Sequence, residues 1–440
     1  MLGCVGILNP VRENFERGYE VGGHLTVYRE GACVVDVVFG YTDLTFTKAY
    51  APDTLQLIFS STKFVESMAM LLLVDKGLLH VDAPIAKYWP EFAQNGKENV
   101  TLGDLMSHAG GLHGVCEPIP LDVVIENGDR FKQILEKTPL DERTFRQKGR
   151  QGYHGITRGL YANEICKLVD PHKRNINELI EQEVLQPMGV KDFRIGVLKG
   201  SEMSQRVGKA IETSAHKFLF GVVPRLLLPK AVTDAIYTDV SLAENETQFI
   251  RNAIGKDKSQ VASQAFTQVW KDGPRSLASY SEHEGWREKH SASTNGFSHG
   301  GVLARLANVF AHKGVDSVTG KRILSEQAVE IASTKLDLLK DETLNTDIRY
   351  TQMGLSDVTT ITQPPPWYSA RNWEAAHNKF QGWLGAGGSL IQYSTSHKMS
   401  VGYTMNRYAM HIADWRGPCY LAEAAAIAER LDAAEAKTSA

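Results

Sequence analysis

The sequence contains little cysteine and no long apolar segment. Its five cysteines are odd in number and widely scattered: Cys4, Cys33, Cys116, Cys166 and Cys419. This spacing argues against a disulfide framework and against a zinc cluster, and it favours reduced thiols in the cytosol. The longest apolar run, Met68 to Val74, is far too short to span a bilayer. We therefore expect a cytoplasmic protein with no membrane span, no metal and no cofactor.

An excess of charge of either sign is also lacking. The formal net charge is −3, so no overall positive field would attract nucleic acid or an anionic membrane. Residues 1–18 have no positively charged start and no small-residue cleavage site, which argues against a secretory signal. The chain has 440 residues, of which 42% are hydrophobic and 22% charged. This composition is that of an ordinary globular protein with a sizeable core.

Strand-like and helical patterns are unevenly distributed along the chain. Two β-rich runs, residues 23–30 and 32–43, predict a hairpin, and alternating segments at 387–394 and 398–406 predict another. Hairpins rather than βαβ crossovers dominate, which indicates an α+β fold. We expect one antiparallel sheet made from both termini, with two domains. The predicted sheet domain comprises residues 1–83 plus 291–440, and the predicted inserted, mainly helical domain comprises residues 84–290.

A serine and a lysine stand three positions apart where an apolar helix begins. Residues three apart share one helix face, so the amine of Lys63 can reach the hydroxyl of Ser60. Burial against Phe64 and Met68 would lower the pKa of the amine and make it a plausible base. Free N–H groups at the helix N-terminus would suit an oxyanion. The alternative is that Ser60 only caps the helix and Lys63 is solvated.

The wider sequence resembles the serine β-lactamase and penicillin-binding-protein superfamily, whose first motif is Ser-x-x-Lys at the start of a buried helix. Four further segments resemble that superfamily in the same order: residues 75–112, 152–171, 293–310 and 382–407. Within it, the sequence is most similar to family VIII carboxylesterases and class C-type β-lactamase-related proteins of bacteria and animals. The resemblance implies a β-lactamase/transpeptidase-like sheet flanked by helices, with the site between the sheet and the helical domain.

The same resemblance implies roles for individual residues. Ser60 would be the nucleophile that forms an acyl-enzyme, and Lys63 and Tyr153 would share the proton transfer. Tyrosine ordinarily ionises near pH 10, so Tyr153 would need a cationic neighbour such as Lys63 to act near neutrality. The backbone N–H groups of Ser60 and Ala386 would form the oxyanion hole. Without the motif context, Tyr153 would be read as a packing residue.

Two departures from the superfamily pattern bear on the substrate. The tyrosine motif lacks the asparagine of Tyr-x-Asn, because Gly155 has no side chain to bind the amide of a β-lactam. The third motif, residues 383–385, lacks the usual cation, and Trp383 offers a flat apolar wall instead. The predicted substrate-contacting residues are His154, Gly155, Trp383, Leu384 and Gly385. We therefore expect a serine hydrolase for small esters or amides, with acyl transfer or peptidase action as variants.

Other readings remain open at this stage. Gly-x-Ser-x-Gly at residues 296–300 follows polar residues that do not suggest a core strand, so we expect Ser298 to cap a helix and not to be a nucleophile. His108 and His113 lack the spacing of a metal site, and we read His108 as structural. The apolar segment 218–232 is core or a flap over the acyl pocket. Alternative functions are a non-catalytic scaffold or filament subunit and a true β-lactamase, and homo-oligomers are possible.

Overall fold

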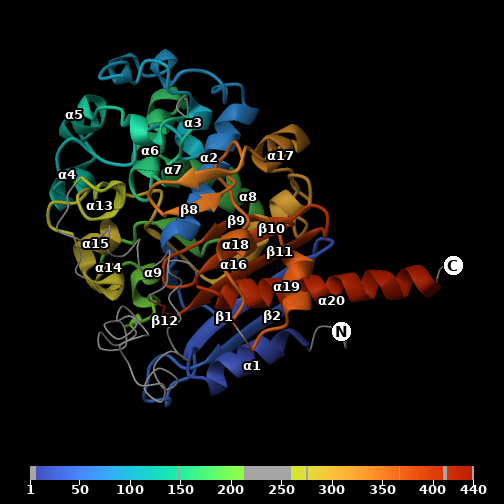
Figure 1. The fold of residues 1–440 in the computed structure, drawn as a ribbon. Helices are drawn as coiled ribbons and strands as arrows, with labels where there is room; N and C mark the ends of the chain where they lie inside the picture. Colours follow the sequence, from blue (N-terminus) through green and yellow to red (C-terminus); the bar gives the residue numbers. More distant parts are fainter. Residues whose placement is uncertain are drawn as a thin grey trace, which may run out of the picture.

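The computed structural model describes residues 6–146, 149–212, 259–273, 276–365, 367–409 and 414–438 (Figure 1). The apolar segment 218–232 and Cys4 lie outside these ranges. No helix within them combines the length and the apolar character that crossing a membrane requires.

A five-stranded antiparallel sheet joins the two ends of the chain. Its strand order is β2-β1-β11-β10-β9. The strands are β1 (Gly22–Arg29), β2 (Ala32–Gly40), β9 (Gln381–Leu384), β10 (Leu390–Ser394) and β11 (Met399–Met405). Both predicted hairpins are confirmed, since β1 pairs with β2 and β10 with β11. The central pairing of β1 with β11 sets Leu25 opposite Tyr403 and so closes the sheet across the whole sequence. The α+β expectation is thereby confirmed.

Helices cover both faces of this sheet. α16 (Gly300–Ala311) lies so close to β11 that a Cβ on Gly402 would meet the Ala304 nitrogen at 2.3 Å. α20 (Arg416–Thr438) contacts the opposite face, where Gly417 faces Leu390 and Tyr403. Side chains of neighbouring strand residues point to opposite faces, so the two helices sandwich the sheet. α1 (Leu8–Glu16) and α19 (Ala370–Ala376) pack against α20.

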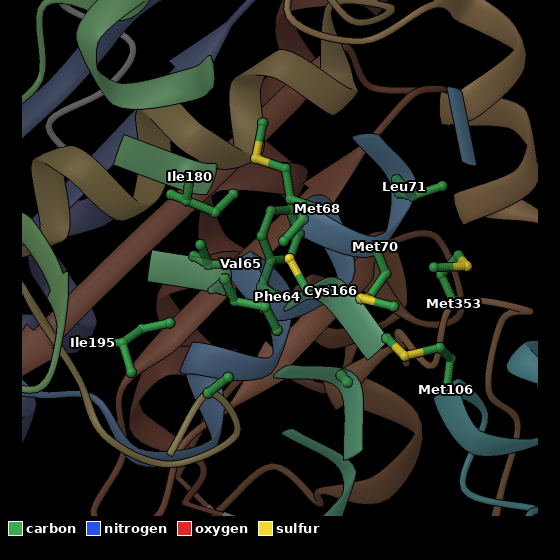
Figure 2. Packing of buried hydrophobic residues seen from close by; sticks show 14 of the residues in the cluster. Phe64, Val65, Met68, Met70, Leu71, Met106, Cys166, Ile180, Ile195 and Met353 are labelled. Carbon is green, nitrogen blue, oxygen red and sulfur yellow. The ribbon is translucent and has the colours of Figure 1, made fainter. Parts of the chain in front are cut away.

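The helix that follows the predicted nucleophile is the centre of the second layer. α2 (Thr62–Asp75) is buried along nearly its whole length, as expected for a helix that is apolar on all sides. It packs against α6 (Thr157–Val169), α7 (Ile176–Ile180) and α17 (Glu326–Ser333). Figure 2 shows side chains of α2 in the same apolar cluster as Cys166 of α6 and Ile180 of α7. This packing fixes the position of the residues at the start of α2.

The remaining elements are short. Before residue 84 they are β3 (Gln56–Leu57) and the 3₁₀-helix η2 (Phe59–Ser61). Between residues 84 and 290 they are η3 (Ile85–Lys87), η4 (Pro90–Phe92), α3 (Leu102–Met106), α4 (Leu121–Glu126), α5 (Asp129–Lys137), η5 (Glu142–Thr144), the π-helix η7 (Glu181–Leu185), α8 (Gln186–Met188), β4 (Phe193–Ile195), α9 (Glu202–Gln205), β5 (Ile211–Glu212), α13 (Val261–Phe266), α14 (Leu277–Glu282) and α15 (Glu284–Glu288). After residue 290 they are β6 (Gly296–Ser298), β7 (Leu339–Asp341), β8 (Thr346–Ile348), α18 (Val358–Ile361) and β12 (Arg407–Tyr408).

A second, three-stranded sheet bears on the predicted domain division. In the order β3-β6-β4, it pairs one strand from the predicted helical insertion with two from the predicted sheet domain. Helices nevertheless dominate the described residues between 84 and 290. The two-domain division stays a prediction.

Candidate active site

The hydroxyls of the predicted nucleophile and the predicted tyrosine meet directly. Tyr153 Oη donates a hydrogen bond of 2.7 Å to Ser60 Oγ. Ser60 is partly exposed, whereas the side chain of Tyr153 is 5% exposed. Tyr153 lies in the loop before α6, and its backbone N–H donates to Asp341 Oδ1 at 3.0 Å. The buried Asp341 carboxylate, whose pKa burial raises to about 6, therefore fixes the backbone that carries the phenol.

The backbone just before Ser60 is strained. Phe59 has a φ of +43°, in the left-handed region that bulky residues avoid. Its ring is held at 5.9 Å from the Tyr280 ring and at 5.5 Å from the Tyr408 ring, centroid to centroid. Such conformations cost on the order of 1–3 kcal/mol and cluster at functional sites, where surrounding packing maintains them. The sequence pattern carries no signal of this strain.

Lys63 is fully buried and does not face Ser60 in the expected way. Its Nζ donates to the carbonyl oxygens of Gly155 at 2.6 Å and Ser293 at 3.1 Å. It also lies 4.8 Å from the centroid of the Tyr153 ring. Considering only described residues, Lys63 and Ser60 share no hydrogen bond, which corrects the prediction of direct contact. The reason is that α2 begins at Thr62, so Ser60 belongs to the preceding 3₁₀ turn and not to regular α-helix.

The environment of Lys63 favours its neutral amine. Burial lowers the pKa of Lys63 well below its ordinary 10.5, the Arg158 charge lowers it further, and Glu66 opposes both. A neutral amine has two N–H donors and one lone pair, whereas the ammonium has three donors. The two carbonyl acceptors match the two donors of the neutral form. The expectation that burial would lower this pKa agrees with the structure.

The pKa of Tyr153 does not shift in the predicted direction. Burial raises the pKa of Tyr153, and this outweighs the lowering by its hydrogen bond with Ser60 and by the Arg158 charge. The sequence instead predicts that a cationic neighbour lowers the pKa of Tyr153 towards neutrality. The resting phenol is therefore protonated, which is consistent with its role as donor to Ser60 Oγ.

A buried ionic network that the sequence analysis missed surrounds Lys63. Arg158 Nε lies 2.8 Å from Glu66 Oε1, and both side chains are fully buried. Ser293 Oγ donates to Glu66 Oε2 at 2.7 Å, and Arg158 also donates to the Lys63 carbonyl at 2.9 Å. One sequence signal was present, because Glu66 is the only charged residue within the apolar run 64–74. A buried charge needs a partner, and the sequence did not reveal which residue it is.

The third motif forms one wall of the site. Trp383, at 5% exposure, stacks on Tyr153 at 5.6 Å and on Tyr350 at 5.9 Å between ring centroids. Its indole is thus held against the phenol. A Cβ on Gly385 would lie 2.1 Å from the Ile58 carbonyl oxygen, so only glycine lets β9 end this close to η2. Leu384 is buried in the core beneath the sheet, which corrects its predicted substrate contact.

Ala386 carries the second backbone N–H of the predicted oxyanion hole. It lies in the turn after β9 and is partly exposed, like Ser60. Within the described ranges, its backbone N–H has no hydrogen-bond acceptor. The turn is tied to the segment before Ser60, since Ser389 Oγ donates to the Ile58 carbonyl at 2.7 Å. The role of the two N–H groups stays a prediction.

His154 and Gly155 are placed differently from the prediction. His154 is fully buried: its Nε2 accepts from Leu112 N at 3.0 Å, and its Nδ1 lies 2.5 Å from the Gly152 carbonyl. This side chain is therefore committed to the backbone, which corrects its predicted substrate contact. Gly155 offers its carbonyl to Lys63, so its observed contact is with the predicted base. His108 is buried and accepts from His154 N at 3.0 Å, in agreement with a structural role.

The position of Ser298 contradicts the prediction that it caps a helix. It is fully buried at the end of β6, and its hydroxyl donates to the Asp192 carbonyl at 2.7 Å. The following helix, α16, has His299 at its N-cap position and no side-chain cap. Ser298 therefore does not cap it. The polar residues before Ser298 do not indicate a strand, because β6 is only three residues long.

Sequence comparison finds relatives that match part of this chain. LipL of Mycobacterium tuberculosis, named an esterase/beta-lactamase, is 29% identical over 180 residues, which are 40% of this chain and 39% of LipL. A putative penicillin-binding protein of Bacillus subtilis, PbpX, is 32% identical over 109 residues, which are 25% of this chain and 27% of PbpX. The chain thus matches about two fifths or less of the length of these relatives.

Two solved structures share the fold over nearly the whole chain. A family VIII carboxylesterase has a TM-score of 0.74 at 22% identity, covering 97% of this chain and 98% of its own. A penicillin-binding-protein homologue from Caulobacter crescentus has a TM-score of 0.72 at 25% identity, covering 97% of each chain. The family model described as Beta-lactamase matches residues 11–415. The chain therefore belongs to the β-lactamase family.

Proposed function

We propose that the protein is a serine hydrolase that forms an acyl-enzyme at Ser60 with small esters or amides. The observation that carries the proposal is the 2.7 Å hydrogen bond between Tyr153 Oη and the partly exposed Ser60 Oγ. Burial lowers the pKa of the Lys63 amine, which lies beside the phenol ring, and this favours the amine as the acceptor of the serine proton. A serine hydroxyl needs such an acceptor before it can attack a carbonyl.

The acylation step begins when Ser60 Oγ attacks the substrate carbonyl carbon. For this attack the resting hydrogen bond, in which the phenol of Tyr153 donates to Ser60 Oγ, reverses. The phenol oxygen then accepts the serine proton while the phenol gives its own proton to Lys63, so no phenolate accumulates. The N–H groups of Ser60 and Ala386 would stabilise the resulting oxyanion. When the tetrahedral intermediate collapses, the bond to the leaving alkoxide or amine breaks and Lys63 returns the proton through Tyr153 to it. Water then attacks the acyl-enzyme by the same route and releases a carboxylic acid and free Ser60.

The apolar wall favours esters over β-lactams. Trp383 stands where a cation would hold a substrate carboxylate, and no side chain at Gly155 can bind an amide group. The similarity to LipL, which is named an esterase/beta-lactamase, supports ester hydrolysis and leaves β-lactam hydrolysis as a second candidate. A chromogenic cephalosporin assay decides between them, and we expect slow hydrolysis at best.

The nucleophile is tested with a fluorophosphonate probe, which labels activated serines. We expect labelling of Ser60 in the wild type, none in Ser60→Ala, and labelling roughly 10²–10⁴-fold slower in Tyr153→Phe, which keeps the ring but loses the phenolic oxygen. Tyr350→Phe is the matched control, because Tyr350 also stacks on Trp383 but donates to Asp341 at 3.3 Å. Labelling that survives in Ser60→Ala would reject the proposal. Absence of labelling and of turnover in a folded wild type would favour a scaffold role.

We also propose a cytoplasmic location and a small-molecule substrate. The location is supported by Cys33, Cys116, Cys166 and Cys419, which are free thiols in the described part of the chain. Cell fractionation checks the location, and light scattering of the purified protein measures its oligomeric state.

A further inference from the structure

An aromatic ring from a distant part of the chain fills the space beside Gly155. A Cβ atom on Gly155 would lie 2.5 Å from Cε1 of Phe266 and 2.8 Å from its Cζ, closer than carbon atoms approach without displacement. The φ angle of Gly155 is outside the left-handed region. Glycine is therefore required here by the contact with Phe266 and not by the backbone conformation.

Phe266 also lies against the phenol of the site. Its ring centroid is 5.9 Å from that of Tyr153, whose ring also contacts Trp383. Phe266 is partly exposed, whereas Tyr153 and Trp383 are buried. Phe266 is therefore the most exposed ring of these three.

The helix that carries Phe266 is firmly anchored. Ala262 and Ala265 of α13 are buried, at 1% and 0% exposure. Gln264 Oε1 accepts a hydrogen bond of 2.7 Å from Arg143 and lies 3.1 Å from Nε2 of the buried His113. Both anchors fix α13 to the loops beside Tyr153, so the ring at position 266 is a preformed surface.

We propose that Phe266 is a specificity-determining residue that selects apolar acyl groups for transfer to Ser60, an inference that rests on the proposed function. The ring offers apolar surface that an alkyl or aryl acyl chain can cover, which favours binding. A polar acyl side chain, such as an acylamino group, would lose its water beside a ring that offers no hydrogen bond, and that loss is costly.

The selectivity is tested with p-nitrophenyl acetate, butyrate and hexanoate. In the wild type, kcat/KM should rise from acetate to hexanoate. In Phe266→Ala this preference should fall roughly tenfold, because a pocket contact of this kind sets discrimination of about 10–200-fold. Phe266→Leu, which keeps apolar volume, should retain most of the preference. Phe39→Ala is the matched control, because Phe39 is also partly buried but lies in β2, at the opposite edge of the sheet from β9.

The contact itself is tested with a double-mutant cycle. Gly155→Ala should slow fluorophosphonate labelling of Ser60 in the wild-type background and slow it less in the Phe266→Ala background, where the space is open. An unchanged chain-length preference in Phe266→Ala, with Ser60 labelling intact, overturns the inference and leaves the proposed function standing. If Phe266→Ala does not fold, an unchanged preference in Phe266→Gln, which fills much of the space but replaces the apolar ring with a polar side chain, overturns it. Loss of Ser60 labelling from the wild type instead overturns the proposed function.

Discussion

Lys63 is fully buried, and its surroundings lower the pKa of its amine. Among the described residues, its Nζ donates hydrogen bonds to carbonyl oxygens and not to a carboxylate, and Glu66, one turn further along α2, is paired with Arg158. The guanidinium of Arg158 thus neutralises the negative charge of Glu66 and adds a positive charge of its own near the Lys63 amine. Both effects, together with burial, favour an amine that can accept a proton.

The first prediction concerns this amine. Because the pKa of Lys63 lies well below 10.5, the rate of Ser60 labelling should rise with pH and level off far below pH 10.5. Lys63→Arg should slow labelling by roughly 10²–10⁴-fold at every pH, because a guanidinium does not lose its proton. Lys76→Arg, at the exposed end of α2, is the control and should label normally. A wild-type rate still rising at pH 10 contradicts the prediction.

At the scale of elements, the site depends on how closely β9 approaches the segment before Ser60. The end of β9 passes the Ile58 carbonyl at a distance that leaves no room for a side chain at Gly385. This approach sets Ala386 next to the 3₁₀ turn that carries Ser60. The predicted oxyanion hole would therefore depend on two packed segments and not on either one.

Gly385→Ala should push these segments apart. We expect a lower melting temperature, corresponding to roughly 1–3 kcal/mol of overpacking, together with much slower labelling of Ser60. Gly128→Ala serves as the control, because a Cβ at that position meets nothing within 4 Å. Circular dichroism and fluorophosphonate labelling measure the two effects. A Gly385→Ala variant with normal labelling would show that the approach is not needed for acylation.

A second buried lysine takes no part in the proposed chemistry. Lys289 follows α15 and is fully buried among three rings, with its Nζ at 4.4 Å from the Trp270 centroid, 4.6 Å from Trp286 and 5.2 Å from Tyr280. Within the described residues its Nζ has no hydrogen-bond partner. Burial lowers the pKa of Lys289 to about 7, while the ring faces attract the ammonium and oppose that shift.

The pH dependence of stability follows from this shift. The folded pKa is lower than the ordinary value of 10.5, so the unfolded chain binds more protons between about pH 7 and 10.5. The contribution of Lys289 to the free energy of unfolding therefore rises with pH across that window. Tyr280, the titratable member of the surrounding rings, has its pKa raised by burial to about 12 and stays neutral there.

Lys289→Met should raise the melting temperature by a few degrees at pH 7 and below, and by less as the pH increases towards 10. The reason is that methionine fills the space without a proton to lose or a charge to bury. Lys271→Met, on the exposed loop nearby, is the control and should change little at any pH. Thermal unfolding from pH 6 to pH 9.5 measures the difference. An equal effect of Lys289→Met at both ends of this range contradicts the prediction.

At the scale of the whole molecule, the sheet joins segments almost four hundred residues apart. β1 pairs with β11, and α20 then covers one face of the sheet. Residues 417–428 of this helix are buried, whereas residues 429 and 430 are exposed. Figure 1 shows the end of α20 projecting away from the rest of the fold. The two parts of the helix should therefore contribute very differently to stability.

Truncation tests this difference. A chain that ends at residue 432 should fold with a melting temperature within a few degrees of the full chain, because it loses little buried surface. A chain that ends at residue 414 should fail to fold, since it uncovers Leu390 and Tyr403, both fully buried in the full chain. Circular dichroism and Ser60 labelling distinguish the two. A stable, labelled chain ending at residue 414 would refute this view of α20.

Local patterns in the sequence were enough to predict the two hairpins, the apolar helix that begins beside Ser60 and the family to which the chain belongs. Period-2 alternation and a continuous apolar run depend only on neighbouring residues. Motif order added Tyr153, which hydrogen-bonds Ser60 as a site residue should. The prediction failed for His154 and Leu384, because adjacency to a motif does not specify which way a side chain points.

The sequence by itself determined that a serine, a lysine and a tyrosine of one family's motifs are present and that the chain forms an α+β fold. Only the tertiary structure decided that Lys63 bonds to the carbonyls of residues 92 and 230 positions away, that Arg158 pairs with Glu66, and that Phe266 fills the space over Gly155. These contacts join segments far apart in the chain. They follow from packing, which no local pattern encodes, and this packing lowers the pKa of Lys63.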